Sequence, residues 1–177
     1  MTTSADLRWT IGRAQSGDQA ALNDVLLAAA RLAAPVTRRI AGADGDDVLQ
    51  GVLWTVARKL PWLDEPDAFK AWVYRIATRA ALKHATRERR FWPVGSRDDL
   101  EAIGGAGPPS EPPDVSRIPE FLALVTPRSR AVIVLHYLEE MTLEDVAAVL
   151  DIPLGTVKSR LAFGLRLMRA GVREQER

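Results

Sequence analysis

The last third of the chain contains two short apolar periodic segments on either side of a proline turn, within residues 142–169. Thr142 followed three residues later by Asp145 resembles a capping box, which marks the start of a helix. Pro153 forces the residue before it out of the helical region, so the turn after the first segment is short. We therefore expect a helix over residues 143–150, with one apolar face made by Leu143, Val146, Ala147 and Leu150.

A second helix is predicted to begin near residues 155–156. Its apolar stripe would be Val157, Leu161, Leu165 and Met168. Two helices joined by so short a turn are typical of a helix-turn-helix, in which the second helix enters the major groove of DNA. The residues of the first turns of that helix are therefore predicted DNA contacts: Thr156, Lys158, Ser159 and Arg160.

Charge is distributed unevenly along this part of the chain. Acids outnumber bases by six to two in residues 118–151, whereas residues 156–173 carry five bases and no acid. A basic face by itself is equally consistent with a solvated helix. The turn length, and the small Ala147 where two helices must cross closely, favour DNA binding over that interpretation.

Bulk composition excludes several classes of protein. The net charge of +1 conceals local values of +4 in residues 1–90, −3 in 91–117 and 0 in 118–177. The chain has no cysteine and two histidines, so neither a metal site nor a cofactor is predicted. No uninterrupted apolar run approaches the ~20 residues of a membrane span, and the N-terminus lacks a signal-peptide pattern. We expect a cytoplasmic protein that does not insert into a membrane.

Composition predicts three regions. Residues 91–117 contain five prolines, four glycines and five acids, and apolar periodicity disappears there. This composition is typical of a flexible linker. The linker would join an N-terminal domain, residues 1–90, to a C-terminal domain, residues 118–177. Its acids are consistent with a solubilising tether or with a polyanion that occupies a basic channel on a partner.

Both flanking domains are predicted to be all-α. Ser16 and Gln19 could cap a first helix, which Pro35 would interrupt or kink. Further helices are expected over residues 46–60 and 66–90, and Thr126 with Pro127 gives a strong start signal for another. The side chains expected to face the core from 66–90 are Phe69, Trp72, Val73, Ile76 and Ala80.

The segment 66–90 also contains a basic stripe, because four cations recur every four residues: Arg75, Arg79, Lys83 and Arg87. Aromatic residues precede or accompany it. Bases of unpaired nucleic acid stack on aromatic rings while cations follow the backbone, so the segment is a candidate single-strand interface. Core packing is the better interpretation for Phe69 and Trp72, whereas Trp62 and Tyr74 are expected to be available for binding.

Three segments, in this order, resemble the extracytoplasmic-function sigma factors of bacterial RNA polymerase: DDVLQGVLWTVARKL (46–60), AFKAWVYRIATRAALKHATRERR (68–90) and LVTPRSRAVIVLHYLEEMTLEDVAAVLDIPLGTVKSRL (124–161). The resemblance implies a promoter-specificity subunit with no catalytic centre. Its N-terminal domain would open and read the downstream promoter element, called −10. Its C-terminal domain would read the upstream element, called −35. The implied partners are core RNA polymerase, promoter DNA and an anti-sigma factor.

The resemblance also assigns residues. Asp47 and Gln50 match the family's contact with polymerase, and Trp72, Tyr74 and Arg75 match its strand-opening segment. Five positions depart from the family pattern. Gly51 stands where an acid is usual, Arg79 replaces an asparagine, and Asp151 replaces a turn glycine. Phe163 and Gly164 stand where an arginine and an alanine are common.

Two other function classes stay open at this point. A sigma-like decoy could bind an anti-sigma factor without directing transcription, which the departures at Gly51 and Arg79 suggest. A conventional helix-turn-helix regulator could use its N-terminal domain for ligand binding or dimerisation. The basic, aromatic segment 72–90 argues against the regulator, because a ligand domain has no need of a cationic stripe.

Overall fold

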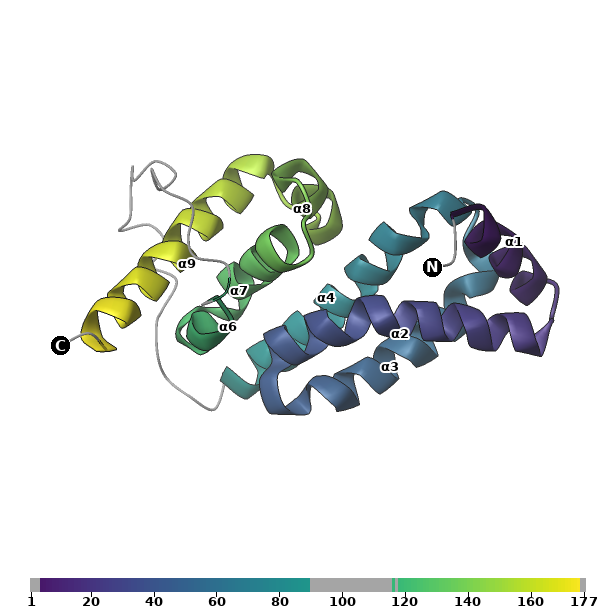
Figure 1. Ribbon diagram of the computed structural model, residues 1–177, viewed down its shortest axis with the longest axis horizontal. Coiled ribbons are helices and arrows are strands. Elements are labelled where there is room, and N and C mark those ends of the chain that lie inside the picture. The colour runs from purple at the N-terminus through teal and green to yellow at the C-terminus, as the bar shows by residue number, and fades with distance from the viewer. Residues whose placement is uncertain (1–3, 90–115, 117, 176–177) are drawn as a thin grey trace. The chain divides into compact units, whose positions relative to one another are not determined.

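The computed structural model of the chain describes residues 4–89, 116 and 118–175 (Figure 1). The chain divides into two compact units, Met1–Ala81 and Leu82–Arg177. Regular structure in the described residues is helical throughout, so the predicted all-α fold is confirmed. The predicted linker 91–117 lies outside the described residues apart from residue 116, and the domain bounds predicted from composition stay predictions.

The first unit is built from helices in the order α1 (Ser4–Gln15), α2 (Gln19–Ala41), η1 (Gly42–Asp44), α3 (Gly45–Lys59), η2 (Leu60–Trp62), η3 (Pro66–Ala68) and α4 (Phe69–Arg89), the last of which continues past Ala81. The predicted cap of the α2 helix is wrong. Asp18, not Ser16, is the N-cap, because its Oδ1 accepts hydrogen bonds from the amides of Ala20 (2.9 Å) and Ala21 (3.1 Å). The hydroxyl of Ser16 instead donates to the carbonyl of Gly12 in the preceding α1 helix.

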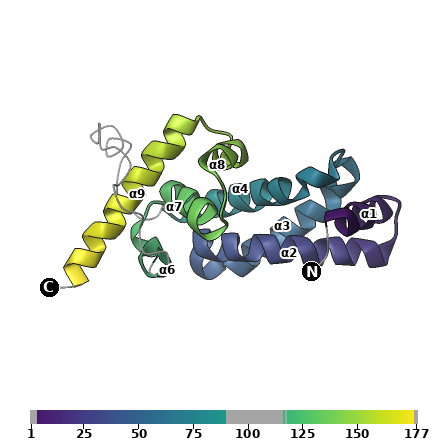
Figure 2. The ribbon, with the colours of Figure 1, turned by 45° about the horizontal axis from the view of Figure 1, so that its top comes forward.

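Helices α2 and α3 pack side by side as a hairpin (Figures 1 and 2). Pro35 does not interrupt α2, which continues to Ala41. The stretch 19–62 is long and apolar enough for a membrane span by length and composition alone. It is bent at η1, however, and its fully buried residues form the core of the hairpin: Val25, Ala29, Ala33, Val36, Ile40, Val52 and Val56. The stretch therefore serves as a core hairpin in this fold.

The buried face of α4 differs from the predicted one. Phe69 and Val73 are buried as expected, but Trp72, Ile76 and Ala80 are only half-buried. The other buried positions of α4 within the first unit are Tyr74, Ala77, Thr78 and Ala81. The prediction placed Trp72 and Ile76 in the core, whereas the buried face of α4 is completed by Tyr74 and by the small residues Ala77 and Ala81.

The second unit contains α6 (Ile118–Phe121), η5 (Leu122–Leu124), α7 (Pro127–Ile133), the π-helical turn η6 (Val134–Leu138), α8 (Leu143–Leu150) and α9 (Leu154–Gln175). Thr126 caps α7 as predicted, because its hydroxyl accepts from the amide of Ser129 at 3.3 Å. Residues 131–135 are fully buried. Gly164 lets α9 approach α7: an added Cβ would lie 2.7 Å from Cδ1 of Ile133 and 3.2 Å from Cβ of Ser129.

Candidate nucleic-acid interface

The helix-turn-helix predicted in the second unit is present as α8, a turn and α9. Helix α8 spans residues 143–150 as predicted. The hydroxyl of Thr142 accepts from the amide of Asp145 at 3.1 Å and donates to its carboxylate at 2.7 Å. Helix α9 begins at Leu154, slightly earlier than predicted, and the carbonyl of Pro153 accepts from the amide of Val157 at 3.1 Å. Proline therefore both ends the turn and opens the second helix.

Asp151 ends α8 in the left-handed region, at φ 56 and ψ 51. Its amide donates to the carbonyl of Ala147, and the amide of Ile152 donates to the same oxygen at 3.2 Å. The position therefore needs the backbone geometry that glycine adopts without strain, and that aspartate tolerates better than most residues.

Asp151→Val should destabilise the second unit by about 1 to 2 kcal/mol, because a β-branched residue is strained in the left-handed region. Asp151→Gly should cause no such loss. Urea unfolding followed by circular dichroism measures both variants. Equal stability of the valine and glycine variants would contradict the assigned turn geometry.

The predicted apolar stripe of α9 is confirmed, because all four of its residues are buried: Val157, Leu161, Leu165 and Met168. On the other side of the helix, Lys158 and Ser159 are exposed, and Thr156 and Arg160 are half-buried. The hydroxyl of Ser159 donates to the carbonyl of Gly155 at 2.7 Å, so the lone pairs of its oxygen are what it can offer to a ligand.

Lys158 and Arg160 lie on opposite flanks of α9, because residues two positions apart in a helix are rotated by roughly 160° about its axis. Gly155, Ser159 and Arg166 lie between the flanks and are exposed. In a helix that lies in a groove, the middle of the outer face meets base edges and the flanks meet the two phosphate backbones. The geometry therefore suits Lys158 and Arg160 to phosphates more than to bases.

Arg160 lies close enough to Arg128 for the two charges to interact. Burial lowers the pKa of the Arg160 guanidinium, and the positive charge of Arg128 on α7 lowers it further. The two side chains thus extend the positive surface from α9 to the start of α7. An anion placed against them would relieve the repulsion between the two cations.

The basic stripe of α4 is present as predicted, and all four cations are exposed: Arg75, Arg79, Lys83 and Arg87. Trp72 lies on the same face and is half-buried against Phe69, with their ring centroids 6.1 Å apart. The face therefore combines a partly accessible indole with cations spaced one helical turn apart.

The expectation that Tyr74 is available for binding is wrong. Its side chain is 2% exposed, and the ammonium of Lys70 lies 5.8 Å from the centre of its ring. Position 74 falls on the buried side of α4 beside Ala77 and Thr78. The ring is therefore not accessible to a base in this structure.

Trp62 is 72% exposed, in agreement with the expectation for its side chain. It lies in η2, which α1 holds in place. The side-chain amide of Gln15 donates to the carbonyls of Leu60 and Leu63, each at 2.9 Å. Its contact with DNA stays a prediction.

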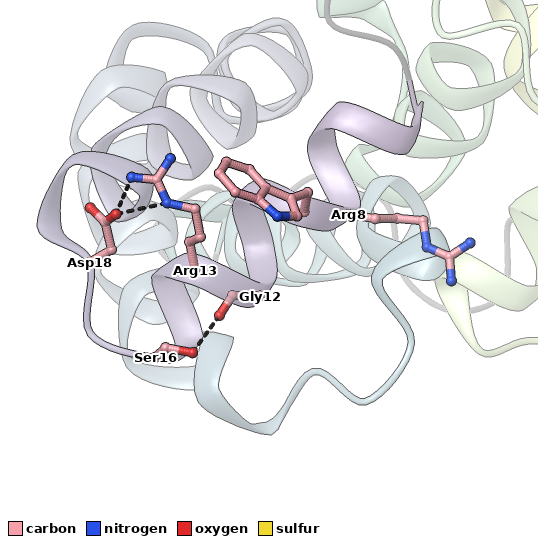
Figure 3. A pocket seen from close by; sticks show the side chains of 6 residues that line it. Arg8, Gly12, Arg13, Ser16 and Asp18 are labelled. Carbon is pink, nitrogen blue, oxygen red and sulfur yellow. Dashed lines mark hydrogen bonds and ion pairs between the residues drawn. The ribbon is translucent and has the colours of Figure 1, made fainter.

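A shallow depression on α1, which the sequence did not indicate, contains a stacked and paired arginine (Figure 3). The Arg13 guanidinium lies 4.6 Å from the centre of the Trp9 ring and donates through Nε to Asp18 at 2.8 Å. The Ala21 amide, and then Arg13, lower the pKa of Asp18 below its usual value. The stabilising contribution of this carboxylate is therefore present at neutral pH and is lost as the pH falls through the lowered pKa. The arrangement joins α1 to α2.

Asp47 and Gln50 are exposed on α3, one helical turn apart. Both therefore lie on the solvent face of the helix, where a partner protein can reach them. A third residue of that face, Trp54, was not identified from the sequence.

Comparison with known families and proteins agrees with this architecture. The family description for sigma-70 region 2 matches residues 19–91, and that for sigma-70 region 4 matches residues 121–170. The chain is 30% identical to the ECF RNA polymerase sigma-E factor of Escherichia coli over 164 residues, which are 85% of this chain and 86% of that protein. It is 27% identical to the ECF sigma factor SigE of Mycolicibacterium smegmatis over 136 residues, or 71% of this chain and 51% of that protein.

Two solved structures have a similar fold. One is CnrH in complex with the cytosolic domain of CnrY, with a TM-score of 0.64, 23% identity, and coverage of 95% of this chain and 97% of that chain. The other is the sigma factor RpoE in complex with the anti-sigma factor NepR from Bartonella quintana, with a TM-score of 0.56, 18% identity, and coverage of 86% and 94%.

The match to region 2 removes the conventional helix-turn-helix regulator as an alternative, because the N-terminal helices belong to a sigma-factor domain and not to a ligand-binding domain. Sigma factors are initiation factors and not enzymes. The chain belongs to the extracytoplasmic-function sigma factors of bacterial RNA polymerase.

Proposed function

We propose that this sigma factor divides promoter recognition between its two units. The first unit opens and reads the downstream element through the exposed face of α4. The second unit binds the upstream element with α9 in the major groove. Asp47 and Gln50 on α3 hold the core polymerase. The observation on which the proposal chiefly rests is that both units expose a cationic helix face.

The face of α4 suits a separated DNA strand. Exposed cations spaced by one helical turn can follow a phosphate backbone, and the half-buried Trp72 offers part of a ring to a base. Trp62, in η2, is the other aromatic side chain proposed for this contact. Tyr74 is not proposed as a DNA contact because its ring is buried.

The face of α9 suits duplex DNA. Lys158 and Arg160, on its two flanks, are proposed to contact phosphates and so to fix the helix in the groove. Thr156 and Ser159, near the helix N-terminus, are proposed to approach base edges, with the Ser159 oxygen as an acceptor. Specificity in this region would then come from these two side chains.

Arg79 is proposed to contact a base of the downstream element. It is exposed and lies between Arg75 and Lys83 on the stripe. Arg79→Asn should change the preferred downstream base by about 1 kcal/mol, or fivefold, because a guanidinium that stacks on a displaced base is replaced by an amide. Arg79→Ala should weaken promoter opening, and more so at low salt, because contacts made by a cation are screened by added ions. Run-off transcription from promoters that differ only in the downstream element measures both effects.

The control for Arg79 is Arg31→Ala, which removes an exposed cation from a different helix, α2. It should leave base preference and opening unchanged. If both Arg79 variants keep the wild-type preference and the wild-type rate of opening, the residue is an ordinary solvated side chain and this part of the proposal is wrong.

We further propose that an anti-sigma factor regulates the protein in the cytoplasm, where polymerase and promoter DNA are found. The support comes from two similar folds, CnrH and RpoE, which were solved in complex with CnrY and with the anti-sigma factor NepR. Decoy activity, in which an anti-sigma factor is bound without any transcription, is the alternative that Gly51 and Arg79 suggest. Binding to core polymerase separates the two functions.

A further inference from the structure

The solvent face of α3 has a tryptophan near its middle. Trp54 is 73% exposed, which is the highest exposed fraction of any large apolar side chain in the described part of the chain. An indole held in water forgoes the burial that is the main stabilising contribution of an aromatic side chain. Fold stability therefore gives no reason for an indole at this position.

Helical spacing places Trp54 in one stripe with charged and polar residues. Asp47 lies seven residues before it, Gln50 four residues before it and Arg58 four residues after it, and all three are exposed. The stripe thus runs from an acid, past an aromatic ring, to a base. Aromatic residues ringed by polar ones are typical of the energetic centre of protein interfaces.

Gly51 adds an open space beside the indole. It lies three residues before Trp54 on the same face and is exposed. A Cβ added at Gly51 would meet no other atom within 4 Å, so close packing inside the unit does not explain the glycine. Glycine is also a much poorer helix former than alanine inside a helix. The helix therefore gives up intrinsic stability to keep a flat surface next to its exposed ring.

The other highly exposed tryptophans of the described residues have different surroundings. Trp9 is 65% exposed, but the Arg13 guanidinium stacks on its ring. Trp62 lies outside α3, in η2. Trp54 is the tryptophan that shares a helix face with the proposed polymerase contacts Asp47 and Gln50.

We propose that Trp54 is the apolar anchor of the surface that binds core RNA polymerase, and that Gly51 is the flat site over which a polymerase side chain packs. The inference rests on the proposed polymerase contact of Asp47 and Gln50 and extends it along α3. The complementary surface on polymerase has an apolar cleft for the indole, a basic group toward Asp47 and an acidic group toward Arg58. In this chain the contact is thus centred on an aromatic ring.

The test measures the affinity of the full chain for core RNA polymerase by competition against a fluorescently labelled wild-type chain. Trp54→Ala should bind at least about tenfold more weakly, since central aromatic anchors dominate interface energy. The loss should persist at high salt because the contact is apolar, whereas the loss in Asp47→Ala should shrink as salt screens its charge. Trp9→Ala, which removes an equally bulky exposed ring from α1, should bind like the wild type.

A second variant separates binding from folding. Gly51→Leu should leave the free chain at least as stable as the wild type, because the site is open and leucine is a better helix former. It should nevertheless weaken polymerase binding by filling the flat site. A stable chain with lower affinity is a result that misfolding cannot produce.

Three outcomes would count against the proposal. If Trp54→Ala binds core polymerase like the wild type while Asp47→Ala binds more weakly, the inference is wrong and the proposed polymerase contact stands. If Trp54→Ala and Trp9→Ala weaken binding equally, the effect is not specific to α3 and the inference is also wrong. If the wild-type chain itself does not bind core polymerase, the proposed function fails, and the inference fails with it.

Discussion

Gly45→Ala should destabilise the first unit by about 1 to 3 kcal/mol, because it overpacks the point where α3 begins against α2. A Cβ at Gly45 would lie 2.4 Å from the Cα of Arg38 and 2.8 Å from its amide nitrogen. Both atoms belong to the backbone of α2, so a change of rotamer cannot relieve the clash. The two helices would have to move apart, which would loosen the valine and alanine core of the hairpin. Chemical denaturation followed by circular dichroism measures the loss.

The matched control lies in the same helix. Gly51→Ala adds the same methyl group to α3 at an open, exposed site, and it should stabilise the chain by about 0.5 to 1 kcal/mol through helix propensity. The two substitutions are thus expected to have opposite signs. A stable Gly45→Ala variant would show that the hairpin does not cross as closely as the structure indicates.

Removing both flanking cations of α9 should reduce the affinity of the polymerase holoenzyme for promoter DNA at least tenfold. Lys158→Ala and Arg160→Ala each remove one proposed contact with phosphate, and hydrogen bonds to charged groups contribute about 1.5 to 3 kcal/mol. The loss should be uniform over upstream sequences, because phosphate contacts carry no base information. Each substitution should also flatten the dependence of log affinity on log salt by about 0.9.

The control for this pair is again Arg31→Ala, which removes one positive charge outside the helix-turn-helix. Its salt dependence should match the wild type. A loss confined to one base position of the upstream element would show that Lys158 or Arg160 reads a base edge. Wild-type affinity in the double variant would show that α9 does not lie in the groove.

The sequence predicted the second unit closely because its signals are local. Thr142 caps α8 through contacts with Asp145, three residues away, and Pro153 ends the turn by its own covalent geometry. The apolar stripe of α9 recurs at helical spacing, so its buried side could be predicted without knowing what covers it. The basic stripe of α4 followed from spacing in the same way.

The features that the sequence did not predict depend on contacts between elements. Among the described residues of helix α1, the buried side chain is Ile11, and the apolar pattern of the helix is too sparse to be recognised. The burial of Tyr74 depends on which side of α4 faces the core, and that side includes the small residues Ala77 and Ala81, whereas the larger Trp72 and Ile76 are half-buried. The close approach at Gly45 and the exposure of Trp54 likewise depend on how α2 and α3 pack.

Run-off transcription tests the division of labour between the two units most directly. Core RNA polymerase would be mixed with the full chain and a library of DNA fragments that vary in both promoter elements. We expect transcripts from discrete start sites, with an upstream base preference that changes after substitution of Thr156 and Ser159 on α9 and a downstream base preference that changes in Arg79→Asn. A chain that binds core polymerase but yields no sigma-dependent transcript from any fragment, or whose base preferences stay the same in these variants, would contradict the division of promoter recognition between the two units.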